Sequence, residues 1–462
     1  MENYLSQFNA LQANRWRVSK SSHEERILKL KKLKNEILRQ REEIKLALYA
    51  DFKKPYAESE LTEIHTAIDE INFAIKNLKR WMKSKKVATP IALWGTTSEI
   101  HYEAKGVVLI LSPWNYPFSL MINPIVAAVA AGNCIIAKPS EKTPHTAEIL
   151  KKVIKNVFSE NEVAMIFGGA EEAQALLELP FDHIFFTGSI NVGKKIMEAA
   201  AKNLTPVTLE LGGKSPVVID TDVDLEQAVL KIAWGKFMNG GQTCVAPDYV
   251  FVPESIKDQF MSLLKTQIEH FYGKTSEQRR NSPDFARLID QGSFNRLKGK
   301  MTNEKLCIDD PMVESENFIA PTFFESSLDS EIMKDEIFGP ILPIISYKDV
   351  NMALNFIHSR TKPLALYIFS RDKSFIKNIL SSPTSGGVAI NEVILQLANP
   401  HLPFGGVGHS GIGSYHGHFG FKAFSHEKAV VRKNIFSLIH LYFPPYRGRV
   451  SQWAFRLLGF LE

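Results

Sequence analysis

Residues 107–118 read VVLILSPWNYPF, an apolar run followed by a loop of aromatic and polar residues between two prolines. Short apolar runs of the same kind recur at 134–137, 163–167, 183–186 and 207–209, with helical patterns between them. Such runs, bounded by turn residues, predict strands. Strands separated by helices require crossover connections, so this part of the chain is predicted to form a parallel sheet of the α/β class.

Ligands of such sheets bind beyond the carboxyl ends of the strands, so the loops after the strands carry the functional signal. The loop after the first run contains Trp114 and the side-chain amide of Asn115. After the second run come Lys138, Ser140 and Glu141, where a cation and a carboxylate stand together. A carboxylate in this place is one of the two parts that a dinucleotide site needs.

A glycine turn after the fourth run supplies the second part. Its residues are Thr187, Gly188, Ser189, Val192 and Gly193. It opens a helix, and the N–H groups at the start of a helix can receive a pyrophosphate. The spacing is not that of the G-x-G-x-x-G fingerprint, and alone it fits a tight strand-to-helix turn equally well. Together with the carboxylate, however, it predicts a dinucleotide-binding site.

A second alternation of strands and helices runs from about residue 215 to 391, and a loop inside it carries Cys244. A thiol is well able to attack a carbonyl, because a few per cent is thiolate at neutral pH and a nearby charge or helix end raises that share. The Asn, Gln and Thr residues around it are wrong for a core strand, which argues against a buried, inert cysteine. Gly240 and Gly241 allow the backbone to approach a ligand closely. Cys244 is therefore the predicted nucleophile.

Four motifs occur along the chain, namely LELGGKSP at 209–216, GQTC at 241–244, EIFGP at 336–340 and LPFGGVG at 402–408. In this order they resemble the motifs of the aldehyde dehydrogenase superfamily, and the resemblance extends over nearly the whole chain. The short N-terminus and the Met-Asn pair before the glycines resemble its class 3 branch, which includes the fatty aldehyde dehydrogenases. Gly240 departs from that pattern, since fatty aldehyde dehydrogenases often carry a second cysteine there.

The resemblance implies the aldehyde dehydrogenase fold: a Rossmann-like NAD-binding domain, an α/β catalytic domain and a small β oligomerisation arm. The implied boundaries are 1–86 and 103–210 for the NAD-binding domain, 211–398 for the catalytic domain, 87–102 and 399–433 for the arm and an active-site cover, and 434–462 for a C-terminal tail. A homodimer is expected from the arm.

The resemblance also implies catalytic roles for three residues. The backbone N–H of Cys244 and the side-chain amide of Asn115 would stabilise the oxyanion that forms on nucleophilic attack. Glu210 would lie opposite Cys244 and activate the water that hydrolyses the thioester. Its flanking leucines and glycines predict desolvation, which raises the pKa of a carboxyl group towards that of a useful base. The alternative is a glutamate on an edge strand that faces water.

For the cofactor, the resemblance places Lys138 and Glu141 at the adenine ribose, residues 188–193 at the pyrophosphate, and Glu336 with Phe338 at the nicotinamide ribose. The complete expected set is Trp114, Lys138, Ser140, Glu141, Thr187, Gly188, Ser189, Val192, Gly193, Leu211, Glu336 and Phe338. Glu141 can accept a hydrogen bond from the ribose 2′-hydroxyl but would repel a 2′-phosphate. NAD is therefore the expected cofactor, with NADP as a weaker substitute.

The predicted function is the NAD(P)-dependent oxidation of medium-chain or long-chain aliphatic aldehydes, and also aromatic ones, to carboxylic acids through a cysteine thiohemiacetal and thioester. One alternative is a CoA-acylating aldehyde dehydrogenase, which does not need the general base, so the presence of Glu210 argues against it. Another is a non-catalytic, membrane-associated binding protein of the same fold. The intact set of Cys244, Glu210 and Asn115 argues against that.

Composition restricts the remaining classes. The net charge of +5 on 462 residues lacks basic runs interleaved with aromatic residues, so no nucleic-acid partner is expected. Three unpaired cysteines and the absence of a signal-like N-terminus predict a cytoplasmic protein in a reducing compartment. The histidines between 401 and 426 are irregularly spaced, so no metal site is expected.

The two ends of the chain carry less chemistry. Charge-laced helical patterns over 22–86 predict a solvated outer layer without a chemical role, and 89–102 is expected to be extended. The apolar run at 435–443 is too short to span a bilayer. Apolar residues from Val450 to Leu461 recur at helical spacing, which fits either a helix lying on the inner face of a membrane or one packed on the protein itself.

Overall fold

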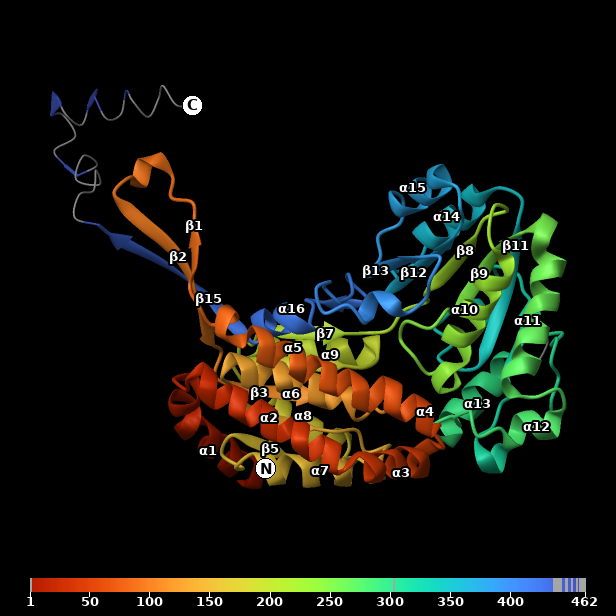
Figure 1. Cartoon of the computed structure of the whole chain (residues 1–462), viewed down its shortest axis with the longest axis horizontal. Coiled ribbons are helices and arrows are strands. Elements are labelled where there is room, and N and C mark those ends of the chain that lie inside the picture. The colour runs from red at the N-terminus through yellow and green to blue at the C-terminus, as the bar shows by residue number, and fades with distance from the viewer. Residues whose placement is uncertain are drawn as a thin grey trace.

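The structure is a computed structural model that describes residues 2–301 and 304–434, with positions 443–444, 448–449, 452–453 and 456 beyond them. The described residues form two six-stranded sheets and one three-stranded sheet. Figure 1 shows the two large sheets in neighbouring bodies, with the small sheet projecting from the outer end of the first body. The predicted α/β class is confirmed. The predicted tail helix lies outside the described residues, apart from those isolated positions.

The first sheet has the strand order β14-β7-β6-β3-β4-β5. Its strands are β3 (Val107–Leu111), β4 (Cys134–Lys138), β5 (Val163–Met165), β6 (His183–Thr187), β7 (Val207–Glu210) and β14 (Gly411–Ile412). The first five are the strands predicted from the apolar runs and are mutually parallel, whereas β14 joins β7 antiparallel. Every residue of β3, β4 and β6 is buried, as expected for a parallel sheet covered on both faces.

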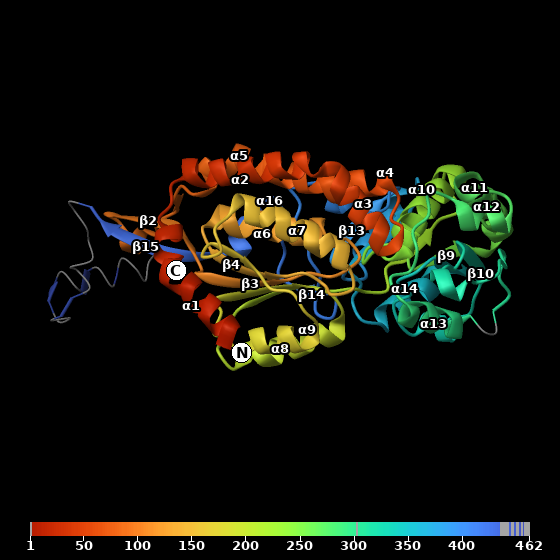
Figure 2. The ribbon, with the colours of Figure 1, turned by 90° about the horizontal axis from the view of Figure 1, so that it is seen from below.

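Helices cover both faces of this sheet (Figure 2). On one face lie α6 (Ser119–Ala131) and α7 (Pro144–Val157), and on the other α1 (Glu2–Ser19), α8 (Ala170–Leu177) and α9 (Ile190–Ala201). The side chain of Ser189 caps α9 by accepting a hydrogen bond from the N–H of Val192. The turn after β6 therefore opens a helix, as predicted.

An outer helical layer covers α6 and α7 (Figure 2). It consists of α2 (His23–Arg39), α3 (Arg41–Phe52), α4 (Tyr56–Ser59), the π-helical turn η1 (Glu60–His65) and α5 (Thr66–Trp81). Ser22 and Glu25 form a capping box at the start of α2, and the apolar faces of these helices are buried against the body. The prediction of a merely solvated layer is wrong at η1, which turns the side chain of Glu63 into the interior with no exposed surface.

The second sheet has the order β10-β11-β9-β8-β12-β13 and is parallel throughout. Its strands are β8 (Pro216–Ile219), β9 (Tyr249–Pro253), β10 (Thr322–Glu325), β11 (Ile341–Tyr347), β12 (Ala365–Phe369) and β13 (Gly387–Ile390). Its helices are α10 (Leu225–Phe237), α11 (Lys257–Tyr272), α12 (Ser276–Asn281), α13 (Gln291–Lys300), α14 (Val350–His358) and α15 (Lys373–Leu380).

The projecting arm consists of β1 (Lys85–Val87), β2 (Thr96–Ala104) and β15 (Ser425–Lys433), with β2 in the centre (Figure 1). The glycine-rich segment before β15 contains the helix α16 (Gly417–Ala423), which packs on α5 and α6. Glu70 of α5 accepts a hydrogen bond of 2.8 Å from the N–H of Gly417 at the start of α16. Tertiary packing here overrides the low helix propensity of glycine.

Candidate active site

A cavity of about 670 Å³ lies between the two bodies and is lined by residues of both. The carboxyl end of β7 leads through residues 211–215 directly into β8, so the loops after the strands of the first sheet face the second body. The predicted site residues that line the cavity are Trp114, Asn115, Thr187, Gly188, Ser189, Glu210, Leu211, Cys244, Glu336 and Phe338. All three predicted catalytic residues thus share one cavity.

Five of the residues expected at the cofactor do not line this cavity. Lys138, Ser140 and Glu141 lie together after β4, where the Lys138 Nζ is 3.7 Å from Glu141 Oε2. Val192 is on the exposed side of α9, and Gly193 is buried against Leu211.

The loop before Cys244 is η3 (Met238–Gly241), in which Asn239, Gly240 and Gly241 have φ of 57°, 62° and 74°. A Cβ on Gly241 would lie 2.3 Å from the carbonyl oxygen of Gly339. At Gly241 the backbone therefore approaches the loop 336–340 closely. Only glycine combines this φ with this contact.

Burial raises the pKa of the Cys244 thiol to about 12, with smaller contributions from the nearby carboxyl groups of Glu336 and Glu210. The N–H groups of Cys244 and Val245 favour the thiolate but do not outweigh these effects. The expectation that the local charge increases the thiolate share is therefore wrong, because burial disfavours the thiolate and the two nearby carboxyl groups add to this effect. Nucleophilic attack requires a group that accepts the thiol proton.

Glu210 is 2% exposed at the end of β7, between β6 and β14. Neither carboxyl oxygen has a hydrogen-bond partner among the described residues. Burial raises the pKa of Glu210 well above its usual value, as its sequence neighbours predicted. The alternative of a water-facing glutamate on an edge strand is excluded.

Asn115 is 4% exposed, and its Nδ2 donates a hydrogen bond of 3.0 Å to the carbonyl oxygen of Gln242. A side-chain amide has two N–H donors, so one remains for an oxygen in the cavity. The neighbouring Tyr116 hydroxyl lies 2.6 Å from the Oγ1 of Thr243. The loop after β3 is thus joined to the cysteine loop at two adjacent positions.

Glu336 and Phe338 close the opposite wall. Burial, with a smaller effect of Asp248, raises the pKa of Glu336 to about 8. A Cβ on Gly212 would lie 2.1 Å from Glu336 Oε2, so this carboxyl group closely approaches the backbone and would have to shift if residue 212 carried a side chain. The ring of Phe338 meets that of Trp114 edge to face, with centroids 5.4 Å apart.

These walls fit a nicotinamide dinucleotide. The Thr187 Oγ1 is buried in the cavity wall without a hydrogen-bond partner among the described residues, and the N-terminus of α9 follows it. Glu336 presents a carboxyl group that can accept hydrogen bonds from ribose hydroxyls. Unpaired donors and acceptors of this kind in a cavity wall suit a ligand that carries hydroxyl and phosphate groups.

Several lining residues were not identified from the sequence. A cationic rim consists of Lys214, Arg296, Lys300, Lys334 and Arg360, and the aromatic wall consists of Phe404 and Tyr415. Arg296 and Lys300 lie on α13 and the other rim residues lie in loops. Apart from Lys214, which is part of the LELGGKSP motif, no local pattern distinguishes them from surface cations. Phe404 lies inside the LPFGGVG motif, so this motif could have indicated from the sequence that Phe404 lines the site.

In the described part of the chain, no three His, Cys, Asp or Glu side chains are grouped so that they could hold a metal ion. Among the same residues, none of the helices has the length and apolar character required to cross a bilayer.

Comparisons with known proteins agree with this geometry. The model of the aldehyde dehydrogenase family matches residues 7–430. A 4,4′-diaponeurosporen-aldehyde dehydrogenase of Staphylococcus aureus is 46% identical over 91% of this chain and 92% of its own. The dimeric NADP-preferring aldehyde dehydrogenase of Rattus norvegicus is 44% identical over 89% of this chain and 90% of its own.

Among solved structures, the substrate-bound state of Staphylococcus aureus AldH superposes with a TM-score of 0.94 at 42% identity and covers 99% of both chains. The match therefore includes the two bodies and the arm. The chain belongs to the class 3 branch of the aldehyde dehydrogenase family, whose members oxidise aldehydes with NAD or NADP.

Proposed function

We propose that this enzyme oxidises medium-chain and long-chain aliphatic aldehydes, and aromatic ones, to carboxylic acids, with Cys244 as nucleophile. The observation that carries this proposal is the meeting of Cys244, Glu210 and Asn115 in one cavity. The sulfur of Cys244 attacks the aldehyde carbon, a C–S bond forms, and the carbonyl oxygen becomes an oxyanion. The thiol proton passes to solvent water as the C–S bond forms, so the carboxylate of Glu210 remains available for the later hydrolysis.

The oxyanion needs donors that are fixed before the reaction. Asn115 has one N–H of its amide committed to Gln242 and one left over, which gives it a defined orientation. The backbone N–H of Cys244 supplies the second donor. Each donor of this kind contributes about 3 kcal/mol to the stability of the transition state.

When bound, the dinucleotide supplies the hydride acceptor of the oxidation, and Glu336, Phe338 and Trp114 would hold its nicotinamide end. The resulting thioester on Cys244 is cleaved by water. Glu210 takes a proton from that water, because a pKa raised well above the usual value of a carboxyl group makes its carboxylate a stronger base. This step separates the proposal from CoA-dependent acyl transfer, in which a thiol replaces water.

The apolar part of the cavity supports a preference for apolar aldehydes. Leu120, Phe404 and Tyr415 line it together with Cys244. The Staphylococcus aureus relative is named for an aldehyde of the diaponeurosporene type, which also points to long, apolar substrates for this chain.

The residues after β4 support NAD as the preferred cofactor. The Glu141 side chain is 52% exposed and stands 3.7 Å from Lys138, where it can accept a hydrogen bond from a ribose 2′-hydroxyl. A 2′-phosphate would be repelled by this carboxylate unless it moved aside. The rat relative is named NADP-preferring, so NADP is proposed as a weaker substitute.

The arm supports a homodimer. Val87, Ile91, Trp94 and Val431 are exposed apolar residues on it, with exposed fractions of 39%, 64%, 59% and 59%. Covering them against a second copy would remove apolar surface from water. The proposed domain limits remain 1–86 with 103–210, 211–398, and 87–102 with 399–433, and the tail after 433 is proposed to favour long-chain substrates at a membrane surface.

The experiment that tests this function measures kcat/KM for a series of linear aldehydes of increasing chain length, once with NAD and once with NADP, by NAD(P)H absorbance. We expect kcat/KM to increase with chain length and to be higher with NAD. A flat series would contradict the proposed substrate class, and a higher value with NADP would contradict the assignment of Lys138 and Glu141. CoA-dependent turnover would favour the acylating alternative.

A further inference from the structure

The turn before Cys244, residues 239–241, has an unfavourable backbone conformation that contacts with neighbouring residues must stabilise. Asn239, Gly240 and Gly241 are three consecutive residues in the left-handed region. That region is unfavourable for residues with a side chain, and a run of it does not form on its own. Asparagine tolerates it better than most residues, but Asn239 still needs contacts from outside the turn.

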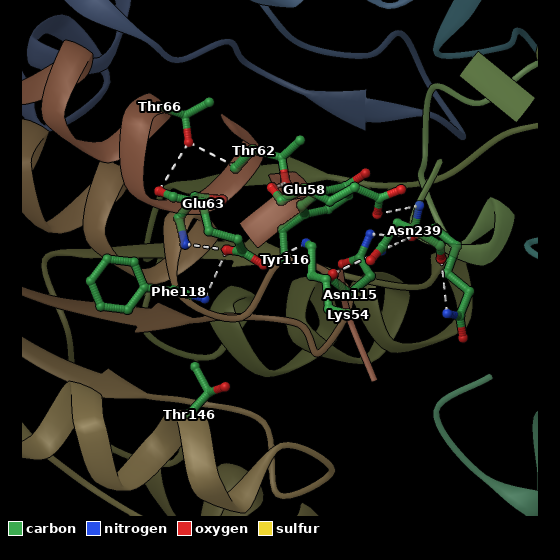
Figure 3. Close-up of polar contacts among 12 residues, drawn as sticks. Lys54, Glu58, Thr62, Glu63, Thr66, Asn115, Tyr116, Phe118, Thr146 and Asn239 are labelled. Atoms are coloured by element: carbon green, nitrogen blue, oxygen red, sulfur yellow. Dashed lines mark hydrogen bonds and ion pairs between the residues drawn. The ribbon is translucent and has the colours of Figure 1, made fainter. Parts of the chain in front are cut away.

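Asn239 donates three hydrogen bonds (Figure 3). Its backbone N–H donates to Glu58 Oε2 at 2.9 Å. Its side-chain amide donates to the carbonyl oxygens of Asn115 and Gln242, at 2.9 and 3.2 Å. Since Asn115 itself donates to Gln242 at 3.0 Å, Glu58, the turn and the proposed oxyanion donor form one hydrogen-bonded chain.

Glu58 belongs to α4 in the outer layer, and it stands beside a buried ion pair. The Nζ of Lys54 donates to Glu63 Oε1 at 2.7 Å, and neither side chain has exposed surface. Lys54 also lowers the pKa of Glu58 through its charge. We refer to Lys54, Glu58 and Glu63 as the outer-layer charge cluster.

The same cluster holds the loop that carries Asn115 (Figure 3). Glu63 Oε2 accepts hydrogen bonds from the N–H groups of Phe118 and Ser119, at 3.2 and 2.8 Å. The Nζ of Lys54 lies 3.8 Å from the ring centroid of Tyr116. Both loops that supply the proposed oxyanion donors are therefore attached to one group of charges outside the cavity.

The carboxyl end of Glu58 is desolvated, although the residue as a whole is partly exposed. This burial raises the pKa of Glu58 to about 7, with Asp284 adding to the effect and with Lys54 and the N–H of Asn239 opposing it. The other titratable groups that its charge affects are Tyr116 and Tyr272. The hydrogen bond to Asn239 is strongest when Glu58 is ionised, because charge-assisted hydrogen bonds exceed neutral ones.

We propose that Glu58 is a positioning residue, which holds the left-handed turn 239–241 and thereby orients the Asn115 amide towards the oxyanion. This inference rests on the proposed role of Cys244 and Asn115. Glu58 does not touch the reacting atoms. It acts by accepting one backbone hydrogen bond at the strained turn.

The test compares two substitutions of Glu58 that differ in the acceptor. Glu58→Met has a similar length and no oxygen, whereas Glu58→Gln keeps an acceptor oxygen. Glu60→Gln is the matched control, because Glu60 lies two residues further on and pairs with Arg41 and Lys45 at the surface. The measurements are the rate of the first-turnover NADH burst, the rate of Cys244 alkylation by iodoacetamide without cofactor, the Kd of NAD and the unfolding temperature.

We expect Glu58→Met to slow the burst about 10- to 100-fold, the range expected on losing a charge-assisted hydrogen bond. Alkylation of Cys244 should change about fivefold or more in the same variant, and the Kd of NAD should stay within about twofold. Glu58→Gln should stay within about threefold of the wild type in the burst and lose the dependence on a group titrating near pH 7. The control should match the wild type.

A burst and an alkylation rate within twofold of the wild type in Glu58→Met would overturn the proposal, as would equal losses in the Met and Gln variants. If Glu58→Met unfolds, Asn239→Gly keeps the left-handed turn but removes the bridge to Asn115, and it should slow the burst about tenfold. An unchanged burst there also overturns the proposal. Because alkylation needs no turnover, a failure of the proposed function remains distinguishable from a failure of the positioning role.

Discussion

Two regions contact the loop that carries Cys244, and they are built differently. The loops after the strands of the first sheet place Asn115 and Glu210 in the cavity by topology, because the carboxyl ends of parallel strands meet at one edge. The outer helical layer instead reaches Asn239 by a side chain that lies 181 positions away in sequence. The positions of Asn115 and Glu210 follow from the order of strands and helices along the chain. The hydrogen bond from the helical layer to Asn239 depends instead on how the helices pack.

The largest loss of activity is expected on substitution of the proposed nucleophile, Cys244. Replacing Cys244 by Ser should lower kcat by about 10⁴-fold or more, because an alcohol without a dedicated base is a far weaker nucleophile than a thiol. The Kd of NAD, measured by fluorescence titration, should remain within about threefold, since the cofactor wall is unchanged. Turnover within tenfold of the wild type would remove Cys244 from its role.

The next largest effect is expected at Glu210. The Glu210→Gln variant should form NADH in a burst of about one equivalent and then turn over roughly 10²- to 10³-fold more slowly, because water attack on the thioester lacks its base. Stopped-flow absorbance separates the two phases. Since the pKa of Glu210 is raised, the wild-type steady-state rate should increase with pH through that pKa, and the variant should lack this increase. A steady rate equal to that of the wild type would contradict the assignment.

A third substitution concerns Asn115, which lies in a strand-end loop and is hydrogen-bonded to the turn that Glu58 contacts. Asn115→Ala removes one donor for the oxyanion and should lower kcat about 10²-fold, with a smaller effect on KM. It also removes the hydrogen bond to Gln242, so a thermal unfolding measurement is the control. A change in KM alone would indicate a role in substrate binding instead of oxyanion stabilisation.

Features that depend on local sequence patterns could be predicted from the sequence, whereas features that depend on packing between distant segments could not. The five buried strands of the first sheet, the glycine turn before α9 and the burial of Glu210 follow from local patterns of apolar residues and glycine. The helix α16 could not be predicted, because the contact of Gly417 with Glu70 is set by packing. The raised pKa of Cys244 also depends on Glu336, which lies 92 positions further along the chain and approaches only in the folded state.

The contribution of Glu210 to stability should oppose its contribution to catalysis. Its carboxyl group is buried without a hydrogen-bond partner among the described residues, and its folded-state pKa is raised well above 4.5. As pH rises above about 4.5, the unfolded chain loses this proton while the folded chain keeps it, so the folded state loses stability until the folded-state pKa is reached.

Glu210→Gln removes this titration and keeps the shape of the side chain. We therefore expect the unfolding temperature of the variant to exceed that of the wild type by about 2 °C at pH 8, with little difference near pH 5. Glu58 and Glu336 also titrate at raised pKa, but they remain in both proteins, so the difference between the two melting curves isolates Glu210. Differential scanning fluorimetry at half-unit steps of pH measures this. A constant difference across that range would show that the Glu210 carboxyl group is ionised in the folded enzyme already at pH 5, and that its isolation in the cavity wall has no cost.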